Sequence, residues 1–471
     1  MKNVKLIYIF ALVVLILAPN VEAKKPKRYQ DVPIPTLDWK LPQHQEYRLP
    51  NGIEGLLVED HEVAMVDFYF KFNAPPDPSD KVGLGEITAW ALRQGGSVNI
   101  PGDSLNDIIE FTASGVYIWT DDEAISIWGN CLSEHLPTIL SLVRELIDLP
   151  AYPQAKIDLK RGTMLEEIRR KNDQPQWVAS REFYKLMYPN HPWGWETSEN
   201  SLSTISRDDL LTYHNLVFRA DGCVIGFSGD LTLDRALELS RQTFGHLTQS
   251  EEEIAGLPSL PPPPAPGVHY GHKEVNQAYI YIGHRSIRYD DPRRIASEIM
   301  NYILGGGGFQ SILMKRIRVD AGLTYAVGSR FTTPVEGEGV FRAGASTRLD
   351  QSGRTLELLR KTIIEYAANG PMLEEFNKAR DAFVNSYVWE YDSSIKILGR
   401  LVYLKWRHLP LDTPQLDLAA YQKLTRDDVK RAAQELLHPD DMLIVVVGDK
   451  SKMDRPLEDF GAVQEINLSQ P

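Results

Sequence analysis

Eleven histidines are the side chains in this sequence best suited to metal chemistry, since two imidazoles one helical turn apart can bind zinc. None of them belongs to an HExxH or HxxEH pattern. His61 is followed by Met65 where a second histidine would have to stand, and His135 has no histidine at helical spacing. His269 and His272 lie in a segment that reads as extended, where a spacing of three points them to opposite faces. The histidines therefore predict no zinc site.

Motifs for nucleophilic catalysis and phosphate binding are equally weak. Residues 226–229 read GFSG, one position short of the GxSxG motif that exposes a serine nucleophile. Four consecutive glycines, Gly305, Gly306, Gly307 and Gly308, are not followed by the GK[ST] of a phosphate loop. Two interpretations of the glycines remain open: a helix end that needs positive φ angles, or an exposed loop whose amides are available to a peptide.

Four stretches carry a family resemblance: residues 82–97 (VGLGEITAWALRQGGS), 159–175 (LKRGTMLEEIRRKNDQP), 301–310 (NYILGGGGFQ) and 317–327 (IRVDAGLTYAV). Their order and spacing, within a duplicated chain, resemble the insulinase/pitrilysin family of zinc metallopeptidases. The resemblance covers essentially the whole chain after its first residues. It implies two homologous domains that enclose a peptide chamber.

The zinc motif of that family is degenerate here. Active members carry HxxEH on one helix, and the resemblance places Glu86 and Trp90 at the two histidine positions and Ala89 at the general base. The family's third ligand, a glutamate, aligns with Glu167. One carboxylate cannot hold a zinc ion that needs three protein ligands, so we interpret Glu167 as a solvated or ion-paired helix residue. The resemblance thus implies no catalytic residue and no metal site in this chain.

A second pair of family residues is retained. Active members carry an Arg and a Tyr seven residues apart in the second domain, and these donate hydrogen bonds to the substrate peptide. Arg318 and Tyr325 have that spacing. A guanidinium and a phenol can together bind a peptide carbonyl and stabilise charge that develops on it. The alternative is an arginine paired with Asp320 and a tyrosine packed in a strand; the family position favours substrate binding. In the non-catalytic subunit of the mitochondrial processing peptidase, a glycine-rich loop like 305–308 is linked to substrate binding.

The elements that position these residues are predicted by an internal repeat. Residues 206–230 (SRDDLLTYHNLVFRADGCVIGFSGD) and 425–449 (TRDDVKRAAQELLHPDDMLIVVVGD) align without a gap at an offset of 219. In both copies Ser206 or Thr425 precedes an acidic first turn, an amphipathic helix follows, and an apolar strand ends in Gly-Asp. Two homologous halves follow from this match.

Each half reads as a sheet with helices packed over it, which is an α+β fold of two domains arranged as a clam shell. Strand patterns occur over residues 53–58, 65–72 and 278–283, and helical patterns over 136–147 and 293–304. The proline-rich segment 248–267 separates the halves, because proline disfavours both a helix and a central strand. We expect peptidase-like domains over 24–247 and 268–471.

The first residues predict export. A basic start, an apolar run over residues 6–18 and small side chains before Ala23 are typical of a signal peptide over residues 1–23. No later apolar run is long enough to span a membrane, so we expect a periplasmic protein. Export permits a disulfide between Cys131 and Cys223, but two buried free thiols are the favoured reading.

Composition limits the partners. With 43% hydrophobic residues the chain is globular, and its net charge of −13 argues against a nucleic-acid ligand. We therefore expect the zinc-free subunit of an exported heterodimeric metalloendopeptidase, with zinc in a paralogous partner and a neutral or basic peptide as substrate. The main alternative is a peptide-binding or envelope scaffold protein with no role in hydrolysis. A peptidase with an unfamiliar site in cis is a third reading.

Overall fold

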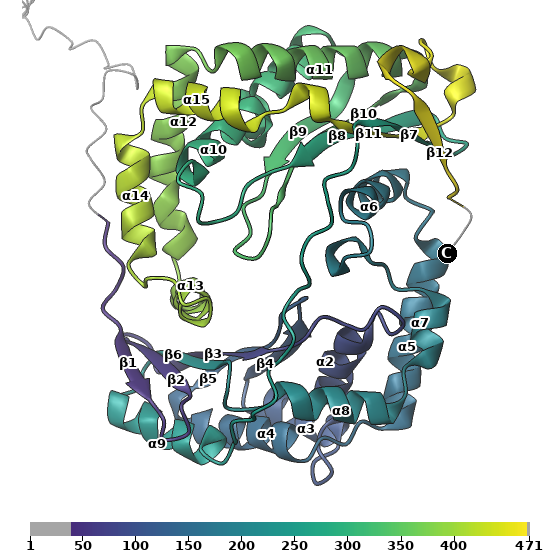
Figure 1. Cartoon of the computed structure of the whole chain (residues 1–471). Helices are drawn as coiled ribbons and strands as arrows, with labels where there is room; N and C mark the ends of the chain where they lie inside the picture. Colours follow the sequence, from purple (N-terminus) through teal and green to yellow (C-terminus); the bar gives the residue numbers. More distant parts are fainter. Residues whose placement is uncertain (1–38, 469–471) are drawn as a thin grey trace, which may run out of the picture. The chain divides into compact units, whose positions relative to one another are not determined.

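Two sheets of six strands each organise the computed structural model, which describes residues 39–468 (Figure 1). Residues 40 onward belong to one compact unit. The predicted signal peptide lies outside the described residues. The first sheet has the order β1-β2-β6-β3-β5-β4. Its strands are β1 (Gln45–Arg48), β2 (Glu54–Glu59), β3 (Met65–Asn73), β4 (Gly115–Thr120), β5 (Ala124–Leu132) and β6 (Cys223–Gly229).

The second sheet repeats this topology with the order β12-β7-β11-β8-β10-β9. Its strands are β7 (Gly267–His272), β8 (Gln277–Arg285), β9 (Thr324–Phe331), β10 (Val340–Arg348), β11 (Leu443–Gly448) and β12 (Val463–Ile466). In both sheets the first and last of five equivalent strands pair in parallel, β2 with β6 and β7 with β11, and the other pairs are antiparallel. The predicted α+β class and the homology of the halves are confirmed. The sixth strands differ, because β1 runs antiparallel to β2 whereas β12 runs parallel to β7.

The repeated segments form the same local structure in both halves. In α8 (Arg207–Val217) the Ser206 hydroxyl accepts from the Asp209 N–H, and the Asp209 carboxylate accepts from the Ser206 N–H. Thr425 and Asp428 form the same reciprocal cap at the start of α15 (Arg426–Leu436). Each cap satisfies amides that have no partner inside the helix, which explains why both helices begin at the predicted residue.

Helices cover the outer face of each sheet (Figure 1). The first half contains α2 (Leu84–Gly95), α3 (Gly102–Phe111), α4 (Leu136–Asp148), α5 (Gln154–Arg170), α6 (Pro175–Met187), α7 (Glu199–Thr204) and α9 (Leu233–Phe244). The second half contains α10 (Arg294–Asn301), α11 (Ser352–Asn369), α12 (Leu373–Ser386), α13 (Ser394–Trp406) and α14 (Thr413–Lys423). Strand β3 contacts a helix layer on each face of the first sheet. Phe68, Phe70 and Phe72 are fully buried, and Phe70 packs edge-on against Phe244 of α9.

The other face of β3 is polar and receives helix α13 from the second half. Side chains alternate along a strand, so Asp67 and Asn73 point away from the phenylalanine layer. The Ser394 hydroxyl donates to Asp67 Oδ2 at 2.5 Å, and the Trp406 indole N–H donates to the Asn73 carbonyl. Helix α6 makes the reciprocal exchange: Phe183 is buried in one cluster with Val445 and Val447 of β11. Each half therefore contributes a helix to the sheet of the other.

We expect Leu398→Ala to lower the free energy of unfolding by about 2–5 kcal/mol, the usual cost of truncating a buried leucine. Leu398 is fully buried in α13, and a Cβ added at Gly226 of β6 would lie 2.7 Å from it, so the two elements are already in contact. Urea denaturation measures the change. Leu416→Ala is the control, because Leu416 is exposed and should lose almost nothing. An equal loss in both variants would contradict the packing role of α13.

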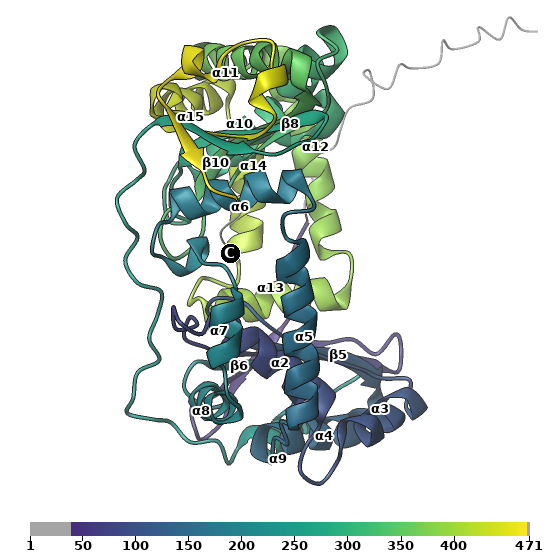
Figure 2. The ribbon, with the colours of Figure 1, turned by 90° about the vertical axis from the view of Figure 1, so that its right-hand side faces the viewer.

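The segment between the sheets has no regular structure but is held in place. From residue 247 to residue 266 the chain forms neither helix nor strand, and Figure 2 shows its extended path along one side. The His191 Nε2–H donates to the Pro258 carbonyl at 3.1 Å, and the Arg285 guanidinium contacts the Pro261 carbonyl at 3.4 Å.

Within residues 39–468 no helix is both long and apolar enough to cross a membrane. Cys131 and Cys223 are buried free thiols, as the sequence favoured.

Candidate functional site

Helix α2 carries the degenerate zinc motif and begins at a defined cap. Gly83 adopts φ 107°, a conformation that favours glycine, and the Asp77 carboxylate accepts from the amides of Gly83 at 2.7 Å and Gly85 at 2.8 Å. Burial raises the pKa of Asp77, while these amides oppose the shift. Because its two oxygens bind the helix start, Asp77 fixes the direction of the helix face that follows.

Glu86, Ala89 and Trp90 share that face and line a cavity of about 500 Å³. Lys160 of α5 lies in the same cavity, and its ammonium donates to Glu86 Oε1 at 2.7 Å. The Lys160 side chain is only 12% exposed, whereas that of Glu86 is 50% exposed, so the ion pair lies at the open side of the cavity. A protein cation thus occupies the position beside Glu86.

Glu167 lies apart from this cavity. It is exposed on α5, and the ion pair at that turn joins the neighbouring Glu166 to Arg169 at 2.6 Å. Among residues 39–468, no three His, Cys, Asp or Glu side chains are placed so that they could hold a metal ion. The donor set of the degenerate motif therefore does not fit a zinc ion.

The structure brings Arg318, Tyr325, Gly305, Gly306 and Gly308 together around a second cavity of about 480 Å³. Two tyrosines and two arginines from three neighbouring strands also line the cavity, and the sequence analysis missed them. They are Tyr279 and Tyr281 of β8, Arg330 of β9 and Arg342 of β10. The Tyr-x-Tyr alternation of residues 279–281 was a signal that both phenols share one face of a strand. No local pattern marks the two arginines, which meet because Arg330 and Arg342 pair across β9 and β10.

The Arg318 guanidinium stacks on two aromatic rings. It lies 4.5 Å from the ring centre of Tyr325 and 4.8 Å from that of Phe309. In the described part of the chain the Arg318 guanidinium forms no ion pair with Asp320. Within residues 39–468, none of its nitrogens donates a hydrogen bond to another residue. Tyr325 is 79% exposed. The pair therefore keeps its hydrogen-bond donors free at the cavity, and the packed, ion-paired alternative is not what the structure contains.

Two of the four glycines are required by the backbone, and three of the four also line the cavity. A Cβ on Gly305 would lie 2.4 Å from the Ser329 hydroxyl, and Gly308 adopts φ 59°. Gly307 is not among the residues that line the cavity. Arg318 stands on a π-helical segment, Met314–Asp320, and a second one, Tyr302–Gly306, leads into the glycines. Insertions of this kind are frequent at functional sites.

Known proteins resemble this chain in sequence and fold. Residues 204–383 match the model of the peptidase M16 inactive domain. The "non-peptidase homolog YmxG" of Helicobacter pylori is 24% identical over 417 residues, which cover 87% of this chain and 94% of that protein. An uncharacterized zinc protease of Rickettsia bellii is 26% identical over 58% of this chain and 65% of its own length.

Solved structures agree. The crystal structure of a peptidase M16 inactive domain from Pseudomonas fluorescens superposes with a TM-score of 0.78 at 27% identity, covering 88% of this chain and all of that one. A protease from Helicobacter pylori shares the fold with a TM-score of 0.77 at 16% identity, over 86% of this chain. The duplicated topology, the degenerate motif on α2 and these matches lead to one conclusion. The chain resembles the M16 peptidases, the insulinase/pitrilysin family, over most of its length, and it lacks their HxxEH zinc motif.

Proposed function

We propose that this chain is the zinc-free subunit of an exported heterodimeric metalloendopeptidase. It contributes the substrate-binding residues Arg318 and Tyr325 and half of a peptide chamber, and a paralogous subunit with an intact HxxEH motif contributes zinc. The chain itself uses no cofactor. The signal peptide over residues 1–23 would direct the chain to the periplasm and then be removed, so sequencing of the mature amino terminus should begin at Lys24.

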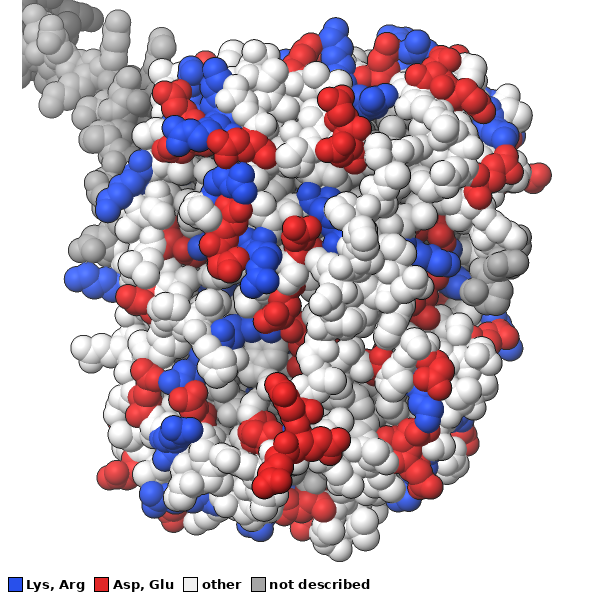
Figure 3. Space-filling model, viewed as in Figure 1, with Lys and Arg blue, Asp and Glu red and all other residues white. Residues whose placement is uncertain are grey.

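The observation that carries this proposal is the state of Arg318. An arginine kept for stability is normally paired with a carboxylate or a carbonyl. The Arg318 guanidinium instead stacks on the exposed ring of Tyr325, and both side chains line a cavity together with glycines. Five N–H donors in a planar fork suit a peptide carbonyl on which negative charge develops. The substrate is a peptide, and the net charge of −13 favours neutral or basic ones. Acidic and basic side chains are interspersed over most of the face in Figure 3, apart from an acidic cluster in its lower middle, so this preference would be modest over most of that face.

Reconstitution tests the proposal. The exported paralogue with an intact HxxEH motif from the same genome is mixed with this chain, and peptide hydrolysis is followed with and without a zinc chelator. We expect chelator-sensitive hydrolysis only when both chains are present. Equal hydrolysis by the zinc-bearing chain alone would reject a role for this chain in catalysis.

The isolated chain should bind no stoichiometric zinc and cleave no peptide. Glu86, Ala89 and Trp90 offer a single carboxylate, already paired with Lys160, where a zinc ion needs imidazole donors and a general base. Elemental analysis of the purified protein after dialysis against zinc measures the content. One tightly bound zinc per chain, together with chelator-sensitive hydrolysis, would contradict the prediction.

A peptide-binding protein without a role in hydrolysis is the second candidate. The name of its Helicobacter pylori relative, a non-peptidase homolog, favours it. The reconstitution separates the two candidates, because a binding protein should retain affinity for peptides and leave the hydrolysis rate of any partner unchanged.

A further inference from the structure

The cavity on α2 is substantial although the helix carries no zinc-binding histidines. Its walls are aromatic and acidic: Trp90, Trp119, Trp195 and Tyr213 line it together with the carboxylates of Asp77, Glu86, Asp121 and Asp122. Indole faces and carboxylates are the two kinds of group that attract an organic cation. A cavity of about 500 Å³ is large enough for a long side chain.

Three of the four carboxylates are already engaged within the protein. Asp77 caps α2 through two amides, Glu86 pairs with Lys160 at 2.7 Å, and Asp121 pairs with Lys71 at 3.0 Å. Asp122 differs, since within the described range its side chain makes neither a hydrogen bond nor an ion pair. The two lysines at this site therefore each match one carboxylate, and one negative charge is left over.

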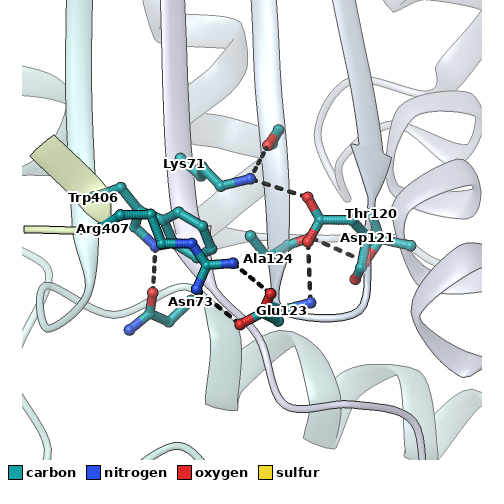
Figure 4. A network of polar contacts seen from close by, with 9 residues as sticks. Lys71, Asn73, Thr120, Asp121, Glu123, Ala124, Trp406 and Arg407 are labelled. Carbon is teal, nitrogen blue, oxygen red and sulfur yellow. Dashed lines mark hydrogen bonds and ion pairs between the residues drawn. The ribbon is translucent and has the colours of Figure 1, made fainter. Parts of the chain in front are cut away.

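Ion pairs on both sides of Asp122, one of them from the second half of the chain, leave Asp122 without a partner in the acidic turn. Residues 121–123 are three consecutive acids in the turn between β4 and β5, and Figure 4 labels the outer two, Asp121 and Glu123. Glu123 receives the Arg407 guanidinium through two hydrogen bonds, one of 2.8 Å, and Lys71 holds Asp121 from the other side while also stacking 4.3 Å over the Trp406 ring. The turn is fixed on both sides of Asp122.

The environment of Asp122 favours a bound cation. Asp122 is exposed at the cavity, and partial burial of its carboxyl, together with the charges of Asp121, Glu123 and Asp77, raises the pKa of Asp122. A cation beside it would relieve that repulsion. The cation is organic rather than a metal ion, because the described residues contain no group of three ligands placed to hold one.

We propose that this cavity binds the side chain of an arginine in a peptide, with the guanidinium against Asp122 and the indole walls. A guanidinium suits the site better than an ammonium, since it is planar, weakly hydrated and stacks on aromatic faces. This inference goes beyond the proposed function because it concerns binding by the chain alone and needs neither zinc nor a partner.

Calorimetric titration of the full chain with N-acetyl-arginine amide tests the inference, with the citrulline analogue as the neutral isostere. We expect the arginine compound to bind at least 10-fold more tightly than the citrulline compound. Asp122→Asn should weaken arginine binding at least 10-fold without lowering the melting temperature, because Asp122 has no partner to lose and the change relieves repulsion from its acidic neighbours. Asp107→Asn is the matched control: it removes the same charge from an exposed site on α3 and should leave the affinity unchanged.

A second variant guards against a folding artefact. Trp195→Ala removes one indole wall and should weaken arginine binding several-fold while the circular dichroism spectrum is retained. Equal affinity for the arginine and citrulline compounds, or equal losses in Asp122→Asn and Asp107→Asn, would overturn the proposal. Hydrolysis by the reconstituted complex is a separate measurement, so its failure would not affect this result.

Discussion

Arg318→Ala is expected to lower the turnover of the reconstituted complex by about 100- to 1000-fold, the usual cost of removing one donor that stabilises developing negative charge. Tyr325→Phe should cost less. This variant keeps the ring on which the guanidinium stacks at 4.5 Å and deletes only a neutral hydroxyl donor, whereas a charged donor makes the stronger hydrogen bond. Steady-state kinetics of each variant mixed with the wild-type zinc-bearing partner measures both effects.

The control for Arg318→Ala is Arg354→Ala, which removes an exposed arginine from α11, away from the cavity. Its turnover should equal that of the wild type. A pull-down and zinc analysis should show that assembly and the partner's metal are intact in all three variants. If Arg318 and Tyr325 are purely structural, the melting temperature falls and assembly weakens without a selective loss of turnover. Unchanged turnover in both site variants would remove them from the active site.

The free energy of unfolding should fall steeply when the pH is lowered from about 6.5 to 4. One buried histidine in each half causes this. The His214 ring nitrogens form hydrogen bonds with the Tyr152 hydroxyl at 2.9 Å and with the Ile147 carbonyl at 2.8 Å. His284 accepts from the His438 amide at 3.0 Å and faces the Arg285 carbonyl at 2.6 Å. Burial lowers the pKa of each imidazole from 6.5 to about 4.

The sign follows from proton linkage. Between pH 4 and 6.5 the unfolded chain binds protons at these histidines and the folded chain does not, so acid favours the unfolded state. The contribution is fully present above pH 6.5 and lost as the pH falls to 4. It amounts to roughly 3 kcal/mol for each histidine, because one pKa unit corresponds to about 1.4 kcal/mol.

Urea denaturation at pH 7, 5.5 and 4 measures this dependence. His214→Gln should be less stable than the wild type at pH 7 and should show a flatter decline towards pH 4. His44→Gln, which removes a histidine from the segment before β1, is the control and should decline as the wild type does. A decline of the same steepness in all three proteins would show that other groups govern the acid sensitivity.

Much of the architecture was predictable from the sequence because it depends on local patterns. The capped helix and apolar strand of each repeat are written in residues 206–230 and 425–449, and they form as predicted. The alternation over residues 65–72 predicted a strand with one apolar face. The loss of the zinc motif is equally a matter of residue identity: Glu86, Ala89 and Trp90 offer one carboxylate and no imidazole, too few ligands for a zinc ion.

Contacts between distant residues were not predictable in this way. Glu167 and Lys160 are seven residues apart, two turns of α5, and both were available to meet Glu86. Two turns separate them by about 10 Å along the helix axis, so the packing of α5 on α2 alone selects Lys160.

The acidic turn makes the same point over a longer span. Asp121, Asp122 and Glu123 are chemically similar neighbours, and nothing in their sequence distinguishes them. Lys71 on β3 and Arg407, which follows α13, take the outer two. Asp122 is left without a partner because a helix from the second half lies across the first sheet, and only the tertiary structure brings those charges together.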